Sequence, residues 1–214
     1  LVRYPIYTRV LISRFLILLG IYVVQGFAQY YIRDWLDLPN PAVVTGNLMA
    51  AIGVTLTLLV FPAGWLSDRL GRWPLNVAAG ITASVGIFLL ALAQSVTSVY
   101  LFDSIIGMAT GVFLSVNWAL ATDLIPPDEG GKYLGLSNLA TAGAGAASRL
   151  GGPLIDGLNA MWPGTFLGYP ATFAVAGLVT FGGAVLMIKG WHQISHFSMD
   201  PGSVTESPSE MGTL

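Results

Sequence analysis

Long stretches without a charged residue alternate with short polar breaks along this chain. Charged side chains are absent from residues 38–67, 73–102, 104–122 and 157–188. A helix that crosses a bilayer needs roughly 20 mostly apolar residues, so each range is long enough for one span. Two further apolar stretches, 15–32 and 133–148, are bounded by charges that can reach the membrane surface or face a cavity. The runs are continuous and do not alternate, so they favour helices over the strands of a membrane barrel.

The polar breaks divide the chain into six predicted transmembrane helices. Each break contains turn-forming residues, and proline and glycine are the commonest among them. The helices are expected at about residues 10–32, 43–66, 75–95, 99–122, 133–158 and 168–189. Residues 191–214 are rich in Ser, Pro, Gly and Glu, which predicts a disordered tail. The expected fold is therefore an all-α, polytopic membrane domain over residues 1–190.

The composition excludes a soluble globular domain. Hydrophobic residues make up 54% of the 214 residues and charged residues only 9%, whereas a soluble domain carries roughly 25% charged residues. So few charges cannot cover a soluble surface, and the lipid bilayer is the expected partner. The chain has no cysteine, which excludes disulfides and thiolate metal sites. We expect no cofactor, no metal and no nucleic acid.

The positions of lysine and arginine predict the orientation of the spans. Only Arg33, beside Asp34 and Asp37, falls in a break on one side. The other side holds Arg3, Arg9, Arg69, Arg72, Lys132 and Lys189. Cytoplasmic loops carry an excess of Lys and Arg. Both termini are therefore expected in the cytoplasm, with the chain in the cell membrane.

The break between the second and third predicted spans carries the most informative motif, Gly64-Trp65-Leu66-Ser67-Asp68-Arg69-Leu70-Gly71-Arg72. Gly64 would let a neighbouring helix approach closely, and Gly71 would permit a tight turn. Asp68 would end one helix where the next begins, and an acidic group favours a helix start. Arg69 and Arg72 can bind carboxylates, and we expect one of them to pair with Asp123, Asp128 or Glu129 of the 123–132 loop. The alternative is a charged turn that only follows the positive-inside rule.

This spacing resembles the Gly-x-x-x-Asp-Arg-x-Gly-Arg signature of the major facilitator superfamily, with Trp73 in place of the usual last basic residue. Residues 126–135 resemble the family's entry to the fifth helix of a half. Gly151-Gly152-Pro153 is similar to its glycine-proline helix motif. The three resemblances together extend over about residues 10–190.

The resemblance implies a secondary transporter of twelve helices in two halves, each an inverted repeat of three helices. The chain would be the C-terminal half, because it starts without Met and has Asp103 where the other half carries an arginine motif. An N-terminal six-helix half is then expected in the full-length chain. The substrate would be a small molecule, with a sugar suggested by residues 118–126 and H+ or Na+ as coupling ion.

Two other classes of protein remain open from the residues. One is a non-transporting six-helix scaffold or regulatory subunit that pairs with another chain. The other is an intramembrane enzyme, which needs a catalytic cluster, whereas the polar groups here are scattered. We therefore expect that the protein is not an enzyme.

Polar side chains follow one face of the first and fourth predicted helices. On the first helix this face holds Arg14, Leu18, Tyr22, Gln25 and Gln29, and on the fourth it holds Asp103, Gly107, Thr110, Leu114, Asn117 and Ala121. Polar groups are costly against lipid, so these faces should meet protein or water. In the resembled family these helices line the central cavity, which makes Tyr22, Gln25, Gln29, Thr110 and Asn117 cavity candidates. Hydrogen bonds between helices are the alternative role.

Four charged residues lie inside predicted spans: Arg14, Asp103, Arg149 and Asp156. A buried charge without a partner is costly. We expect Asp103 to pair with Arg149, with an Arg149–Asp156 contact as the alternative. Seven residues separate the latter two, about 10 Å along a helix.

Overall fold

The computed structural model of the chain describes residues 5–125 and 129–197, with the backbone alone described at residue 60 and at residues 190–197. Its elements are α1 (Pro5–Asp34), α2 (Pro41–Leu70), α3 (Arg72–Ala91), α4 (Val96–Asp123), α5 (Gly130–Ala147), the 3₁₀ turn η2 (Ser148–Leu150), α6 (Gly151–Met161) and α7 (Gly168–Phe197). No strand occurs in the two described ranges, which confirms the predicted all-α class.

Local chemistry sets several helix ends. Asn40, with a φ of 58°, precedes Pro41, whose missing N–H is one of the unpaired donors at a helix start in any case. Gly71, with a φ of 90°, makes the one-residue turn between α2 and α3. Ser95 caps α4, because its side chain accepts from the Ser98 N–H while the Ser98 side chain accepts from the Ser95 N–H.

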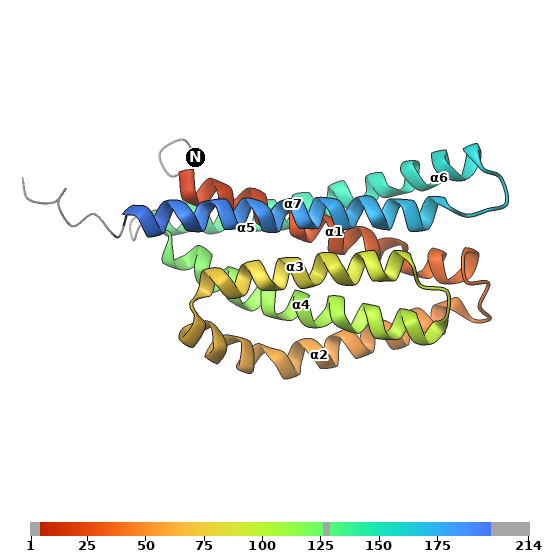
Figure 1. Ribbon diagram of the computed structural model, residues 1–214, viewed down its shortest axis with the longest axis horizontal. Helices are drawn as coiled ribbons and strands as arrows, with labels where there is room; N and C mark the ends of the chain where they lie inside the picture. Colours follow the sequence, from red (N-terminus) through yellow and green to blue (C-terminus); the bar gives the residue numbers. More distant parts are fainter. Residues whose placement is uncertain (1–4, 126–128, 198–214) are drawn as a thin grey trace, which may run out of the picture.

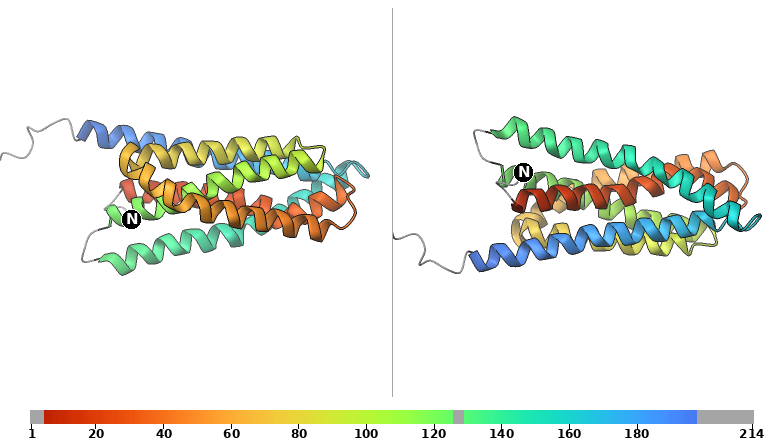
Figure 2. Two further views of the ribbon diagram at one scale, coloured as in Figure 1. Left: turned by 90° about the horizontal axis from the view of Figure 1, so that it is seen from below. Right: turned by 90° about the horizontal axis from the view of Figure 1, so that it is seen from above.

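The helices run lengthwise in one bundle (Figure 1). The start of α1, the α2–α3 turn and the end of α7 lie at one end, here called the terminal end, and the α1–α2, α3–α4 and α6–α7 connections lie at the opposite end. The most extensive helix contacts are α1 with α7, α3 with α4, α3 with α7 and α2 with α4, while α5 packs on α1. Figure 2 shows α1 lying between α5 and α7.

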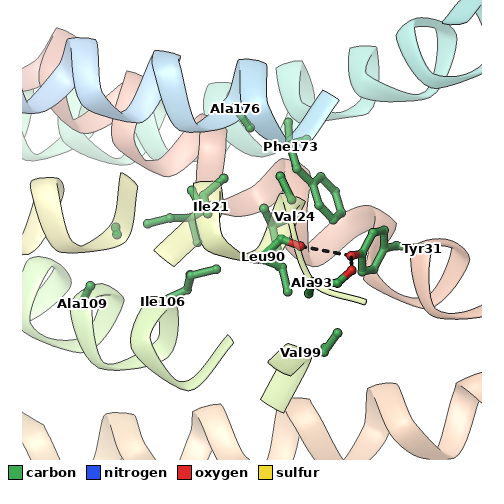
Figure 3. Close-up of a cluster of buried hydrophobic side chains, with 14 of the residues drawn as sticks. Ile21, Val24, Tyr31, Leu90, Ala93, Val99, Ile106, Ala109, Phe173 and Ala176 are labelled. Atoms are coloured by element: carbon green, nitrogen blue, oxygen red, sulfur yellow. Dashed lines mark hydrogen bonds between the residues drawn. The ribbon is translucent and has the colours of Figure 1, made fainter. Parts of the chain in front are cut away.

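The largest group of buried apolar side chains joins α1, α3, α4 and α7 (Figure 3). Ile21 and Val24 of α1 meet Phe173 of α7 in this core, and all three are at most 1% exposed. The Tyr31 hydroxyl lies within hydrogen-bond distance of the carbonyl oxygens of Leu90, at 3.1 Å, and Ala93, at 2.8 Å. This polar contact fixes α1 against the end of α3.

Five helices in the described residues are long and apolar enough to cross a membrane: α1, α3, α4, Pro41–Leu59 of α2 and Gly168–Lys189 of α7. The expected single helix at 133–158 is divided instead into α5, η2 and α6. Pro153 gives the physical reason. It has no N–H to donate to the carbonyl of Arg149, four residues earlier, and its ring crowds that carbonyl. The regular ladder therefore breaks at residues 148–150.

The last helix is longer than the sequence predicts. α7 continues to Phe197 and not only to residue 189, so the first residues of the expected tail are helical. No proline interrupts residues 189–197, and nothing in the backbone forces an earlier end. The remainder of the expected tail, residues 198–214, lies outside the described residues.

Candidate functional site

The polar face of α1 points toward the α5–α6 segment. Halfway along this contact, Tyr22 and Gln25 line a cavity of about 310 Å³ together with Gly26, Gly145, Ser148 and Arg149. Both Tyr22 and Gln25 are half-buried. Gln29, one turn further along the same face, is exposed. The α1 candidates from the sequence thus share one face, and two of them line one cavity.

Nearer the terminal end, Arg14 of α1 fills the space between α1 and α5. It is only 4% exposed. Its Nε donates to Oγ1 of Thr141 at 2.9 Å, and its Nη1 donates to Oδ1 of Asn117 at 2.5 Å. The guanidinium carbon lies 5.6 Å from the centre of the Trp118 ring. Arg14 therefore ties α1 to both α4 and α5, which gives Asn117 a helix-joining role in the structure.

A second polar contact extends this connection by two turns. The Tyr7 hydroxyl donates to the carbonyl of Tyr133 at 2.5 Å and lies 2.9 Å from the Ser137 hydroxyl. Sequence reasoning missed Tyr7, Ser137 and Thr141 as members of the site. Their spacing could have identified them, because residues four or seven apart lie on one face of a helix. Ser137 and Thr141 are four residues apart on α5, and Tyr7 is seven residues before Arg14 on α1.

Arg149 has a different environment from Arg14. It belongs to η2, is exposed, and makes no hydrogen bond or ion pair with any described residue. A Cβ atom built at Gly26 would lie 3.9 Å from its Nη1, which places the guanidinium against the backbone of α1.

The expected Asp103–Arg149 pair is wrong, since none of the ion pairs among the described residues includes either residue. Asp103 is buried on the stripe of α4 that also holds Gly107 and Gly111. Cβ atoms at these glycines would contact Ile52 and Leu56 of α2. The stripe faces α2, whereas Arg149 packs beside α1. Thr110 donates to the carbonyl of Ile106 within its own helix.

The alternative Arg149–Asp156 contact is also absent from the described residues. Asp156 lines a separate cavity of about 470 Å³ near the opposite end, where α1, α6 and α7 meet. In this cavity Asp34 accepts from Arg33 Nε and from the Tyr169 hydroxyl, both at 2.5 Å. Asp34 is thus paired within the chain, and Asp156 makes no hydrogen bond or ion pair with the described residues.

The loop motif lies at the terminal end of the bundle. Arg72 Nη1 lies 2.5 Å from Oδ2 of Asp123 and also donates to the carbonyl of Ala119 at 3.0 Å. One of the expected loop pairs is therefore present. Arg69 instead lies over the ring of Trp65, at 4.0 Å from its centre.

Other parts of the motif differ from the expectation. No atom lies within 4 Å of a Cβ built at Gly64, so the close helix approach expected there is wrong for the described residues. Asp68 lies 4.0 Å from Arg72, on the exposed surface. Glu129 pairs with Lys132 at 3.1 Å, and Asp128 lies outside the described residues.

Comparison with known proteins identifies relatives over most of the chain. The sequence profile of the Major Facilitator Superfamily matches residues 9–209. An uncharacterized MFS-type transporter of Mycobacterium tuberculosis is 30% identical over 121 residues, which are 56% of this chain and 17% of that protein. The MFS transporter asaE of Aspergillus flavus is 26% identical over 162 residues, which are 71% of this chain and 34% of that protein. Multidrug resistance protein 3 of Bacillus subtilis is 29% identical over 128 residues, or 54% of this chain and 25% of that protein.

The fold has a solved counterpart. It is similar to the crystal structure of the POT family transporter PepTSo, with a TM-score of 0.74, 15% sequence identity, and coverage of 88% of this chain and 38% of that one. The chain therefore spans about a sixth to a third of the curated relatives' length. The apolar helices, the loop motif and the profile match agree, and the chain belongs to the major facilitator superfamily of multi-pass membrane transporters.

Proposed function

We propose that the chain forms the C-terminal six-helix half of a secondary transporter that moves a small solute by alternating access. The cavity between α1 and the α5–α6 segment carries the proposal. Gln25 lies nine residues before the end of α1, about 14 Å at 1.5 Å per residue. That depth is close to the middle of a hydrocarbon core about 30 Å thick, where transporters of this kind bind their solutes.

Six spans are supported by the geometry of the broken segment. α5, η2 and α6 follow one another along the bundle (Figure 1) and together cover residues 130–161. At about 1.5 Å per residue these 32 residues reach about 48 Å, which exceeds the thickness of the hydrocarbon core. We therefore treat the segment as one span with an irregular turn inside it.

An inverted repeat of three helices is supported by the helix contacts. If the two halves of the bundle are repeats, α1 corresponds to α4, α2 to the α5–α6 segment, and α3 to α7. Under this correspondence the α1–α7 contact becomes the α4–α3 contact. The same correspondence converts the α2–α4 contact into the α5–α1 contact and maps the α3–α7 contact onto itself. All of these contacts occur in the bundle, which is the pattern that two repeats of opposite topology produce.

Shared orientation of the termini is supported by the bundle as well. The start of α1 and the end of α7 lie at the terminal end, together with Arg69 and Arg72 (Figure 1). We propose that this end faces the cytoplasm of a cell membrane, in agreement with the excess of basic residues there. The Arg72–Asp123 pair would then stabilise one state of the transport cycle relative to another.

Accessibility of single cysteines tests alternating access, and the absence of native cysteine in this chain simplifies the design. In the whole protein that contains the chain, freed of other cysteines, Gln25→Cys should react with membrane-impermeant thiol reagents from either side. A state locked by a conformation-specific binder should react from one side only. Leu178→Cys, on the exposed apolar face of α7, is the control and should stay unreactive.

Thiol labelling at the two ends of the bundle tests its orientation in the membrane. Asp37→Cys should react from outside the cell and Leu70→Cys should not. Reaction of Gln25→Cys from a single side under every condition would instead indicate the non-transporting scaffold. Reaction of Leu70→Cys from outside would overturn the proposed orientation.

A further inference from the structure

The depth of Arg149 in the bundle is unusual for a charged side chain. It lies 12 residues before Met161, the end of α6, or about 18 Å at 1.5 Å per residue. It also lies 19 residues, about 28 Å, after the start of α5. A guanidinium at this depth has a high free-energy cost unless it meets a partner, water or a cavity. Such a residue therefore indicates a functional site.

The backbone presents this arginine to the cavity. Pro153 interrupts the helix ladder at the Arg149 carbonyl, and residues 148–150 form a 3₁₀ turn in the α5–α6 span. Irregular backbone at membrane depth is tolerated where it lines a cavity or is buried in protein. The turn and the cavity coincide here, because Ser148 and Arg149 both line it.

The remaining cavity wall suits a polar ligand. Tyr22 and Gln25 bring a hydroxyl and an amide from α1, so donors are available on the side facing Arg149. The Ser148 hydroxyl donates to the Gly145 carbonyl at 2.8 Å, so the donors available to an anion in the cavity are those of Tyr22, Gln25 and Arg149. The volume of about 310 Å³ is at the lower end of the range for small-molecule sites.

The charges around the cavity are unbalanced. Arg14, further along the same contact, has only neutral partners among the described residues. Asp34 is already paired with Arg33 and Tyr169. Asp156 lies seven residues from Arg149, about 10 Å along the helix, and lines the other cavity. Arg149 is therefore the one charged residue in the cavity lining, and no acidic side chain of the described residues pairs with it.

We propose that Arg149 binds an anionic group of the transported solute, a carboxylate or a phosphate, in the cavity lined by Tyr22, Gln25 and Ser148. The inference rests on the proposed function and adds to it the class of solute. The planar guanidinium can donate two parallel hydrogen bonds to either group, a geometry that lysine cannot reproduce. The alternative is that the anionic partner of Arg149 belongs to the transporter itself, as an acidic side chain from another part of the protein.

Three aromatic probes of nearly the same shape test the charge preference. The whole protein in detergent is heated with benzoate, benzamide or benzylamine at equal concentrations, and the midpoint of unfolding, Tm, is measured. Benzoate at saturation should raise Tm by about 2 °C or more, because a ligand that binds only the folded state stabilises it. Benzamide and benzylamine should leave Tm unchanged. An equal response to benzamide would overturn the proposal.

Variants link the response to Arg149. In Arg149→Gln the apparent affinity for benzoate should fall at least tenfold, and Arg149→Lys should keep part of it, since the charge remains without the fork. Lys189→Gln, an exposed position of α7 near the terminal end, is the matched control and should respond as the unaltered protein does. A benzoate response that survives in Arg149→Gln would overturn the proposal.

The competing partner has a distinct signature. If an acidic side chain of the transporter is already paired with Arg149, benzoate should not change the Tm of the unaltered protein. Arg149→Gln should then lower Tm in the absence of ligand. That result would also overturn the proposal. Benzoate binding through Arg149 combined with one-sided labelling of Gln25→Cys would instead refute only the proposed transport function.

Discussion

Helix α1 has two sides that differ sharply in packing. On the α7 side, the two backbones approach so closely that a Cβ atom at Gly20 would lie 2.5 Å from the carbonyl oxygen of Ala176. The Ser13 hydroxyl donates across the same contact to the carbonyl of Gly183 at 2.7 Å. On the α5–α6 side, cavities of about 310 and 470 Å³ remain between the helices.

The difference separates two roles along one helix. Glycine and small side chains on the α7 side allow tight packing and fix α1 within the bundle. Polar and charged side chains on the α5–α6 side line the two cavities that remain there. Arg14 and Arg149 repeat the contrast within that second side, since Arg14 is buried among partners and Arg149 is exposed and has no hydrogen bond or ion pair with the described residues.

The largest effect should come from breaking the tight side. Gly20→Ala introduces a Cβ atom that would overlap the Ala176 carbonyl oxygen and the Thr180 hydroxyl, so the helices must separate. Overpacking of this kind costs about 1–3 kcal/mol, and the thermal midpoint in detergent should fall.

The matched control lies on the open side. A Cβ atom at Gly145 would lie 3.9 Å from the Tyr22 ring, which is an ordinary contact. Gly145→Ala should therefore be neutral or stabilise by up to about 1 kcal/mol through helix propensity. Equal destabilisation by both substitutions would contradict the proposed difference between the two sides.

Removing a partner of the buried Arg14 should destabilise the protein nearly as much. Asn117→Leu removes the acceptor for Arg14 and leaves a buried guanidinium with fewer partners. A hydrogen bond to a charged group contributes roughly 1.5–3 kcal/mol, so a loss of that size is expected in unfolding measurements. Asn138→Leu, on the exposed face of α5, is the control and should change stability by less than about 0.5 kcal/mol.

Away from α1, the Arg72–Asp123 pair between α3 and α4 should contribute less to stability than either of these contacts. Its side chains are 33% and 52% exposed, and exposed pairs contribute about 0–1 kcal/mol. A double-mutant cycle with Arg72→Gln and Asp123→Asn should give a coupling energy in this range that shrinks as salt is added. A coupling energy that salt leaves unchanged would mean that the pair is shielded from solvent.

The smallest effect should follow from Arg149→Gln. Because Arg149 makes no hydrogen bond or ion pair with the described residues, its removal should change the free energy of unfolding by less than about 0.5 kcal/mol. Thermal unfolding of the whole protein without ligand gives the measurement. The same substitution at Arg14 is the comparison and should be clearly destabilising, since Asn117 and Thr141 would lose their donors.

The sequence was sufficient for features that depend on local pattern. The length of the uncharged runs predicts spans, and the helical period places Tyr22 and Gln25 on one face of α1. The positions of Gly71 and Pro41 predict turns that the structure confirms. Each of these inferences requires only the chemistry of neighbours along the chain.

Features that depend on which helices meet could not be read in the same way. Asp103 and Arg149 lie at compatible depths, yet the Asp103 stripe packs on α2 and Arg149 packs beside α1. Helical spacing identifies a polar face but not the helix that covers it. The role of Thr141 as partner of Arg14 was missed for the same reason.

The 3₁₀ turn of η2 also sets the angular phase between α5 and α6. A 3₁₀ helix advances about 120° and 2.0 Å per residue, whereas an α-helix advances about 100° and 1.5 Å. If residues 148–150 returned to α-helical geometry, α6 would turn by about 60° relative to α5 and shift along the axis by about 1.5 Å. Asp156 would swing with α6 while Gly145 stayed in place on α5. A change of backbone geometry confined to these three residues would therefore rotate the whole of α6 relative to α5.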